Sequence, residues 1–237
     1  MSTREDVERI LRATPREARA DLQGLRLTYM DLTRLDLAGA NLKGTQLEGA
    51  DLRDTNLTGA ILVGADLLNA ILVRTHLAGA DLTRACLEGA DLGAANLVGA
   101  NLRDANLEGA FFRDADLRGA SFTLHAKLRR ADLTRANLAG LDLSWAVLAV
   151  ANLEGANLSG CNLSRAQLQQ ANLEGANLEG ADCRGADFTS AELGCARLRG
   201  ARFEGAMMRD ADLRAMGFDR ADFTGANLQG ATLPLRR

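Results

Sequence analysis

An apolar residue recurs at every fifth position along almost the whole chain. The series starts at Leu22, runs without interruption to Phe122, shifts by one residue, and continues from Leu128 to Leu233. It contains 43 positions, of which 35 are Leu and 6 are Phe, and none of them is polar. We therefore expect all of these positions, called core positions below, to be buried.

The other four positions of the five-residue unit also have preferences. Ala occupies 34 of the 43 positions two residues before a core position, and Asp or Asn occupies 26 of the 43 directly before it. Of the 24 Gly, 21 lie two residues after a core position. The unit therefore reads Ala-(Asp/Asn)-Leu-x-Gly, and the position after the core residue is variable and mostly polar.

A period of five excludes a regular helix or strand. On an α-helix, residues five apart are rotated by about 500°, so core positions would spiral around every face. On a strand, side chains at odd spacing alternate between faces. If the chain turns by about a right angle in each unit, every core side chain points inward, and four units close one coil. Coils paired in parallel at roughly 4.8 Å give a rod on the order of 50 Å long, and right-handed is the expected hand of parallel crossovers. We predict an all-β fold, a right-handed quadrilateral parallel β-helix solenoid.

The repeat resembles that of the pentapeptide-repeat family, whose motif is Ala-(Asp/Asn)-Leu-x-x. Residues 40–44, 50–54 and 176–180 match it closely, and the resemblance covers about residues 21–233. Membership of this family implies the same right-handed quadrilateral β-helix. It does not imply a single function.

The ends and the one-residue shift suggest further divisions. Residues 1–20 are expected to form a short capping α-helix and a lead-in, since Val7, Ile10 and Leu11 fall on one helical face before Pro15. The β-helix is expected in two halves, 21–122 and 128–233, joined by a register slip or bulge at 123–127. Residues 234–237 are expected to form a C-terminal tail.

Composition narrows the possible partners. The net charge is -3, from 28 basic and 31 acidic residues, which gives no strong electrostatic attraction to nucleic acid or to a membrane. The N-terminus has no apolar stretch of signal-peptide length, and no segment approaches the ~18 apolar residues of a membrane span. We expect a cytoplasmic protein that binds neither nucleic acid nor membrane directly.

The sequence carries no recognisable catalytic or cofactor motif. The two His residues, His76 and His125, lie far apart, and the four Cys residues show no metal-ligand spacing. Asp and Asn alternate at one position of the unit, which is typical of a turn role and not of a catalytic acid. We therefore expect no enzyme activity, no metal and no cofactor.

The strongest candidate for a binding surface lies around Trp145, the only Trp of the chain. If the coil count continues through the slip, Leu124 and Trp145 occupy equivalent corners and stack. Aromatic, aliphatic and basic side chains together are typical of binding surfaces. The candidate residues are Leu124, His125, Lys127, Arg129, Arg130, Trp145, Val147 and Val150.

Two further sets are apolar at positions where this chain is usually polar or near its C-terminal end. Exposed apolar clusters often mark binding surfaces, although a stable scaffold also tolerates such drift. The second candidate patch comprises Ile61, Val63, Leu68, Ile71, Val73 and Phe111. An uncapped C-terminal coil suggests a homodimer, and its candidate residues are Met207, Met216, Phe218, Phe223 and Leu235.

Two functions remain open from the sequence. The repeat resembles that of the quinolone-resistance pentapeptide proteins, which implies a DNA mimic that binds DNA gyrase or topoisomerase IV and protects them from quinolone-like or toxin poisons. Mostly Leu core positions, the low net charge and the lack of long loops depart from that group. The alternative is a protein-interaction scaffold or regulator with an unrelated partner.

Overall fold

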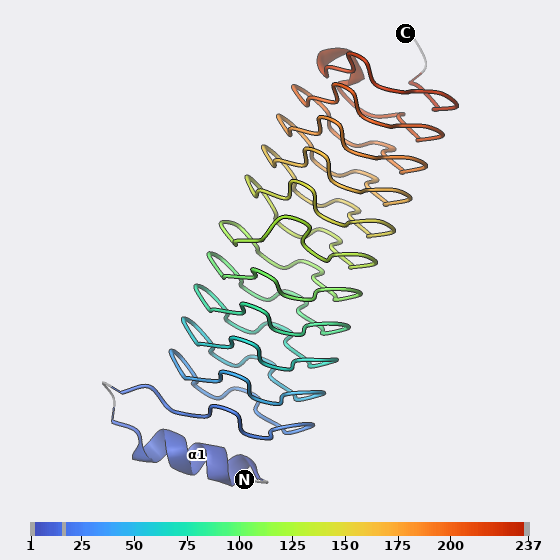
Figure 1. Ribbon diagram of the computed structural model, residues 1–237. Helices are drawn as coiled ribbons and strands as arrows, with labels where there is room; N and C mark the ends of the chain where they lie inside the picture. The colour runs from blue at the N-terminus through green and yellow to red at the C-terminus, as the bar shows by residue number, and fades with distance from the viewer. Residues whose placement is uncertain (1–2, 16–17, 235–237) are drawn as a thin grey trace. The chain divides into compact units, whose positions relative to one another are not determined.

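The computed structural model describes residues 3–15 and 18–234, which form two compact units, Met1–Thr123 and Leu124–Arg237. Each unit consists of stacked coils (Figure 1). Two helices occur in the described residues, α1 (Arg4–Ala13) and the 3-10 helix η1 (Phe218–Arg220). No helix in this part of the chain is long and apolar enough to cross a membrane.

Neighbouring coils are paired in parallel by single β-bridges between residues 20 positions apart. In the first coil these bridges are Asp21↔Asn41, Arg26↔Gln46, Asp31↔Asp51 and Asp36↔Asn56. The same spacing continues in the second unit, for example from Lys127 to Val147. Four bridges in each coil, one for each five-residue unit, confirm the predicted β-helix class. The right-handed sense of the coil stays a prediction.

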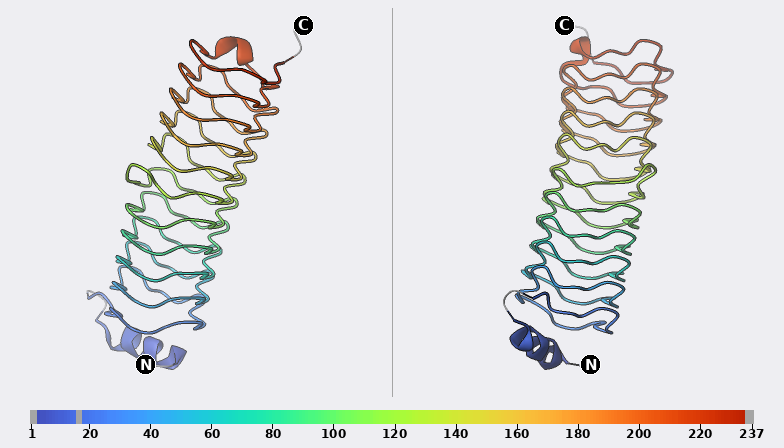
Figure 2. Two further views of the ribbon diagram at one scale, coloured as in Figure 1. Left: turned by 45° about the vertical axis from the view of Figure 1, so that its right-hand side comes forward. Right: turned by 60° about the vertical axis from the view of Figure 1, so that its left-hand side comes forward.

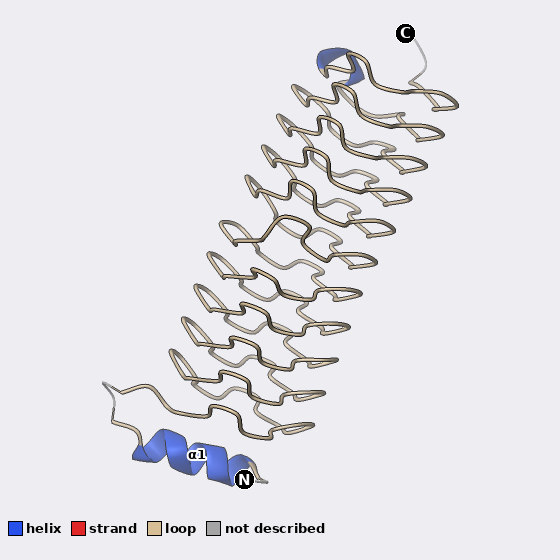
Figure 3. Cartoon of the chain, in the orientation of Figure 1, coloured by secondary structure: helices blue, strands red, loops and turns tan. Residues whose placement is uncertain are grey.

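The pairing differs from the strands that the β-helix prediction implies, because the described residues form only isolated bridges (Figure 3). The reason is the turn that each unit contains. The N–H of Leu25 donates to the carbonyl of Leu22 (3.3 Å), and Gly24 between them has φ 66°. This left-handed conformation suits Gly and recurs at nearly every corner, so only one residue in five keeps an extended bridge.

The core positions are buried as predicted through most of both units. Leu67, Leu107 and Leu153, for example, have no exposed surface, and burying one such side chain contributes about 2 kcal/mol as an upper estimate. Where Thr replaces the small Ala, its hydroxyl remains satisfied: Oγ1 of Thr55 donates to the Leu32 carbonyl at 2.8 Å. The core is therefore a dry column whose few polar groups bond to the backbone of the preceding coil.

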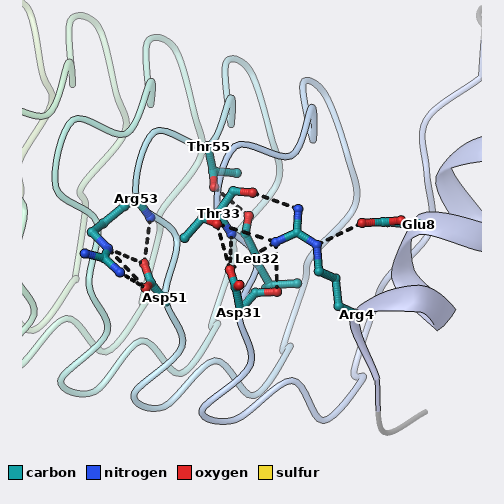
Figure 4. A network of polar contacts seen from close by, with 8 residues as sticks. All are labelled: Arg4, Glu8, Asp31, Leu32, Thr33, Asp51, Arg53 and Thr55. Atoms are coloured by element: carbon teal, nitrogen blue, oxygen red, sulfur yellow. Dashed lines mark hydrogen bonds and ion pairs between the residues drawn. The ribbon is translucent and has the colours of Figure 1, made fainter.

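Helix α1 lies against the first coil of its unit (Figures 1 and 2). Thr3 caps its N-terminus by accepting from the Asp6 N–H, and Val7 is fully buried. Arg4 donates to the Thr33 carbonyl at 3.0 Å and to Asp31 at 3.0 Å, and Glu8 holds its other side at 2.8 Å (Figure 4). Arg4 thus bonds to groups at the open edge of the first coil, which no preceding coil covers.

The expected unbroken register from Leu128 to Leu233 is wrong near the C-terminal end. Met216 bridges to Arg197, which lies 19 positions earlier instead of 20. The next bridge, from Asp222 to Arg202, again spans 20 positions. Because the bridge comes one residue early, Gly217 adopts φ 74° and Phe218 begins η1 instead of filling a core position. The core positions that are not fully buried are Phe122, Phe218, Phe223, Leu228 and Leu233.

Candidate functional site

Trp145 stands at a corner of the second unit, between side chains from the coils on either side. Its ring lies 5.7 Å from the His125 ring, centroid to centroid, and the guanidinium carbon of Arg165 lies 4.9 Å from the Trp145 centroid. Arg above an indole face is a cation–π contact. Trp145 remains 37% exposed, so its ring is held between His125 and Arg165 but stays accessible to a partner.

The residue whose side chain packs against Trp145 is His125, with the two rings tilted by 52°, so the predicted pairing of Leu124 with Trp145 is wrong. The bridge from Lys127 to Val147 sets the register, and 20 residues before Trp145 lies His125. Leu124 precedes this corner and is 62% exposed. The reason for the error is that the extra residue lies before position 125, not after it.

The predicted neighbours of Trp145 lie on the adjoining face and at the next corner. Lys127 and Arg129 are exposed, Val147 is half-buried, and Val150 is 44% exposed. All belong to the first coils of the second unit. Together with Arg165, they define what we call the Trp145 surface: Leu124, His125, Lys127, Arg129, Arg130, Trp145, Val147, Val150 and Arg165.

The corners of this surface carry bulky side chains in a backbone conformation that favours Gly. The φ angles of His125, Arg130, Trp145 and Val150 are 63°, 58°, 62° and 61°. A left-handed conformation costs a non-glycine residue roughly 1–2 kcal/mol, and a β-branched residue such as Val150 adopts it rarely. Non-Gly residues adopt the same conformation at other corners, for example Arg84 (φ 59°) and Ser190 (φ 57°), so it belongs to the repeat and does not distinguish this surface.

The second candidate patch does not form one surface. Ile61 and Ile71 are two five-residue units apart, so they bridge to different columns and lie on opposite faces of a four-sided coil. Leu68 lies on the face between them. On the face of Ile71, the bridges run from Ile71 to Asp91 and from Asp91 to Phe111, so a carboxylate separates the two apolar residues. Val63 lies two residues after Ile61, and Val73 lies two residues after Ile71, so each Val lies on the same face as that Ile.

The residues proposed for a dimer divide into two groups. Met207 and Met216 occupy bridging positions and are exposed on the sides of the coils. Phe223 lies in the last coil, stacked on Phe203 (5.0 Å) and on Phe218 (4.5 Å). Leu233, which was not singled out, is 46% exposed in the same coil. Leu235 lies outside the described residues.

The remaining His and Cys residues are not brought together. His76 bridges to Asn56 and Asn96 in the first unit. Cys161 is buried and donates to the Leu138 carbonyl, and burial raises the pKa of its thiol to about 11. Burial also raises the pKa of Cys183. Since a raised pKa keeps a thiol protonated at neutral pH, neither group is a poised nucleophile.

An acidic hollow in the second unit was not anticipated from the sequence. It has a volume of about 760 Å³ and is lined in part by Glu174, Glu192, Asp210 and Asp212. It forms where Gly194 occupies the position after a core residue and leaves a gap on the outer face. Gly194 is one of two Gly residues without a positive φ. In the sequence, the hollow could have been recognised from a Gly that directly follows a core residue instead of lying two residues after it. Among the described residues, no group of three or more His, Cys, Asp or Glu side chains is placed to hold a metal ion.

The family model for pentapeptide repeats matches the chain in eight copies. The matched residues are 18–54, 50–89, 85–123, 126–165, 166–205 and 196–233. The chain belongs to the pentapeptide-repeat family. Proteins of this family fold as right-handed β-helices and generally act as structural or binding proteins. No curated protein matches the chain significantly.

Solved structures of other pentapeptide-repeat proteins are similar to this one. HetL of the cyanobacterium Nostoc sp. strain PCC 7120, involved in heterocyst differentiation regulation, is 34% identical over 98% of this chain and 95% of HetL, with a TM-score of 0.48. Rfr23 of the cyanobacterium Cyanothece 51142 is 30% identical over 44% of this chain and 87% of Rfr23, with a TM-score of 0.30. Full-length QnrB1, a plasmid-mediated fluoroquinolone resistance protein, is 21% identical over 87% of this chain and 90% of QnrB1, with a TM-score of 0.30.

Proposed function

We propose that this pentapeptide-repeat chain is a non-enzymatic protein-binding scaffold and that the Trp145 surface is its binding surface. The observation that carries the proposal is Trp145 itself, held partly exposed between His125 and Arg165. Trp and Arg dominate binding hot spots. A ring that is already fixed on a coil loses little rotational freedom when a partner binds, which favours affinity.

The acidic residues of the repeat support binding over catalysis because they already have a structural role. Asp51 accepts from the Arg53 N–H at 3.2 Å, and Asn96 accepts from the Val98 N–H at 3.1 Å. The same bond recurs in unit after unit, and Asp and Asn form it alike. These carboxylates close turns, so their abundance does not indicate a catalytic pair.

As the specific partner we propose a type II topoisomerase, DNA gyrase or topoisomerase IV, which the chain would bind as a DNA mimic and protect from quinolone-like or toxin poisons. The acidic face of the second unit supports this partner. Glu154 and Glu174 follow each other in successive coils beside Glu192. Their coil spacing of roughly 4.8 Å is comparable to the ~3.4 Å of helix axis per phosphate on one DNA strand. Such a partner would place the chain in the cytoplasm.

A regulatory scaffold with an unrelated partner is the alternative, and the ion pairs of the surface favour it. Arg53, Arg118 and Arg184 each neutralise the Asp two residues earlier. Together with a net charge of -3, this pairing leaves most faces close to neutral, unlike duplex DNA. The alternative needs only the Trp145 surface and not the acidic face.

Supercoiling of relaxed plasmid by purified gyrase separates the two partners. The topoisomerase proposal predicts that the parent chain inhibits supercoiling or reduces fluoroquinolone-stabilised cleavage. The double variant Glu174→Gln/Glu192→Gln should weaken the effect about tenfold, whereas Glu108→Gln in the first unit should not. If the parent chain has no effect on either reaction at concentrations well above that of the enzyme, the topoisomerase is not the partner.

We also propose a homodimer formed through the C-terminal coil. Within the described residues, the N–H groups of Phe223, Gly225 and Leu228 have no backbone acceptor, whereas their counterparts Phe203, Gly205 and Met208 each donate to the following coil. Unpaired donors beside the exposed Leu233 form an edge that a second chain could cover.

A further inference from the structure

The positive charges of the Trp145 surface have no ion-pair partner among the described residues. Where an Asp directly precedes a core residue and an Arg directly follows it, the two side chains pair: Arg184 pairs with Asp182 and Arg214 with Asp212. At Arg129 the corresponding residue is Lys127. Two cations thus stand where those units have an ion pair, and Arg129 has no carboxylate at the position that neutralises Arg184 and Arg214.

The neighbouring cations extend this positive area. Within residues 3–15 and 18–234, neither Arg130 nor Arg165 forms an ion pair. Along the column that begins with Lys127, the next residues are Val147 and Gln167, and the first carboxylate is Asp187, three coils away. The surface therefore combines several uncompensated positive charges with the apolar groups of Trp145, Val147 and Val150.

The dimensions of the surface decide what kind of partner fits. One face is five residues wide, at most about 17 Å, and three coils rise about 10 Å. The resulting area of roughly 200 Å² is far below the ~800 Å² that each partner buries in a stable interface between globular proteins. The surface suits a short extended segment and is too small to hold a second copy of this chain.

We propose that the Trp145 surface binds a short, extended acidic segment of a protein partner. In this complex, an apolar side chain of the segment packs on Trp145 and Val147, while its carboxylates pair with Lys127, Arg129 and Arg130. The inference rests on the proposed function, because it names the chemistry of the partner at the same surface. Charge-assisted hydrogen bonds from Arg to carboxylates supply both strength and orientation.

A protein segment fits the surface better than a single-stranded nucleic acid does. Binding of single strands relies on several aromatic side chains, each stacking on one base, along a basic groove. Trp145 is the only Trp, and the only Tyr, Tyr29, belongs to the first unit. Val147 and Val150 contribute neither stacking nor phosphate contacts, whereas they suit an aliphatic side chain.

Trp145 also provides the measurement, since the fluorescence of the full chain comes from this one indole. The probe is a capped nonapeptide of three Asp-Glu-Leu triplets, titrated in low salt. The inference predicts a saturable change in emission that is at least tenfold weaker in the Arg129→Gln/Arg130→Gln variant and is suppressed by 0.5 M NaCl. The matched Arg103→Gln variant changes an exposed Arg at the same place in the unit and should bind like the parent.

Three outcomes overturn the inference: no response to the acidic peptide, an equal response to an Asn-Gln-Leu version, or a response to nine-residue oligothymidylate alone. Failure of the proposed function looks different. If Trp145→Ala leaves the effect on gyrase unchanged while the acidic peptide binds the parent, the surface has the inferred chemistry but is not where that partner binds. If Trp145→Ala weakens the effect on gyrase while the peptide does not bind, only the acidic segment is wrong.

Discussion

At the scale of single residues, Leu67 and Leu68 are consecutive leucines in opposite environments. Leu67 is fully buried at a core position, and Leu68 is half-buried on the outer surface. Leu67→Ala should lower the free energy of unfolding by about 3 kcal/mol because it leaves a cavity in a dry column. Leu68→Ala should lower it by less than about 1 kcal/mol. Urea unfolding of both variants checks the register, and equal losses would contradict it.

Thr55 tests how the core treats a polar group. Its hydroxyl donates to the Leu32 carbonyl, and the side chain is fully buried. Thr55→Val keeps the shape but removes this bond and leaves the Leu32 carbonyl only the longer bond from the Leu35 N–H (3.4 Å), so we expect a loss of about 1 kcal/mol. Thr58→Val, at an exposed corner, is the control and should stay within about 0.5 kcal/mol. A neutral Thr55→Val variant in the same denaturation experiment would show that the bond contributes nothing.

At the scale of the five-residue unit, the Asp–Arg pairs link stability to pH. Hydrogen bonds from Arg53 and Arg184 hold the pKa of Asp51 and Asp182 below the usual range, and Asp116 and Asp212 have the same arrangement. A carboxyl whose pKa is lowered by folding stabilises the protein above its unfolded pKa of about 3.9, and this stabilisation is lost as the pH falls through the lower folded value. The melting temperature should therefore change little from pH 7 to 5 and fall below about pH 4.

The control for this pH dependence is Asp51→Asn/Asp182→Asn. Asn can still accept the N–H bond of the turn, as Asn96 does, but it does not titrate. The variant should melt at a lower temperature than the parent at pH 7, and the difference between the two should shrink as the pH falls below about 4. A difference that stays constant across this range would mean that these pairs do not contribute to the acid sensitivity.

The units also explain how much could be predicted from the sequence. A strict five-residue period fixes which residue points inward, so the buried side chains of Leu67 and Leu107 follow from the pattern alone. The early bridge at Met216 could not be predicted, because Phe218 keeps the period in the sequence while the backbone leaves it. Arg4 was also missed, since its bonds to Asp31 and Thr33 depend on where α1 docks.

The candidate surfaces were predictable only where neighbours follow from the period. Trp145, Val147 and Val150 lie within two units of each other, so their grouping was expected and Arg165 could have been added by counting 20 residues onward. The residue that packs against Trp145 was predicted wrongly, because the extra residue could lie on either side of position 125. The second candidate patch does not form one surface because apolar residues two units apart, such as Ile61 and Ile71, lie on opposite faces of the coil.

At the scale of the whole molecule, the proposed homodimer can be tested at the exposed Leu233. We predict that Leu233→Arg shifts the chain from dimer to monomer in sedimentation velocity, because it puts a charge at the proposed contact. Met207→Arg is the control, since that side chain lies on the side of a coil, and it should leave the dimer intact. A parent chain that is monomeric at high micromolar concentration would rule out the dimer itself.

The most direct test of the central claim combines binding and stability in one pair of variants. We expect that the double variant Trp145→Ala/Arg129→Glu inhibits gyrase supercoiling at least tenfold more weakly. Its melting temperature should stay within a few degrees of the parent, because both side chains are exposed. Arg103→Glu should inhibit as the parent does. Full inhibition by the double variant with an unchanged melt would contradict the claim that the Trp145 surface is the binding surface.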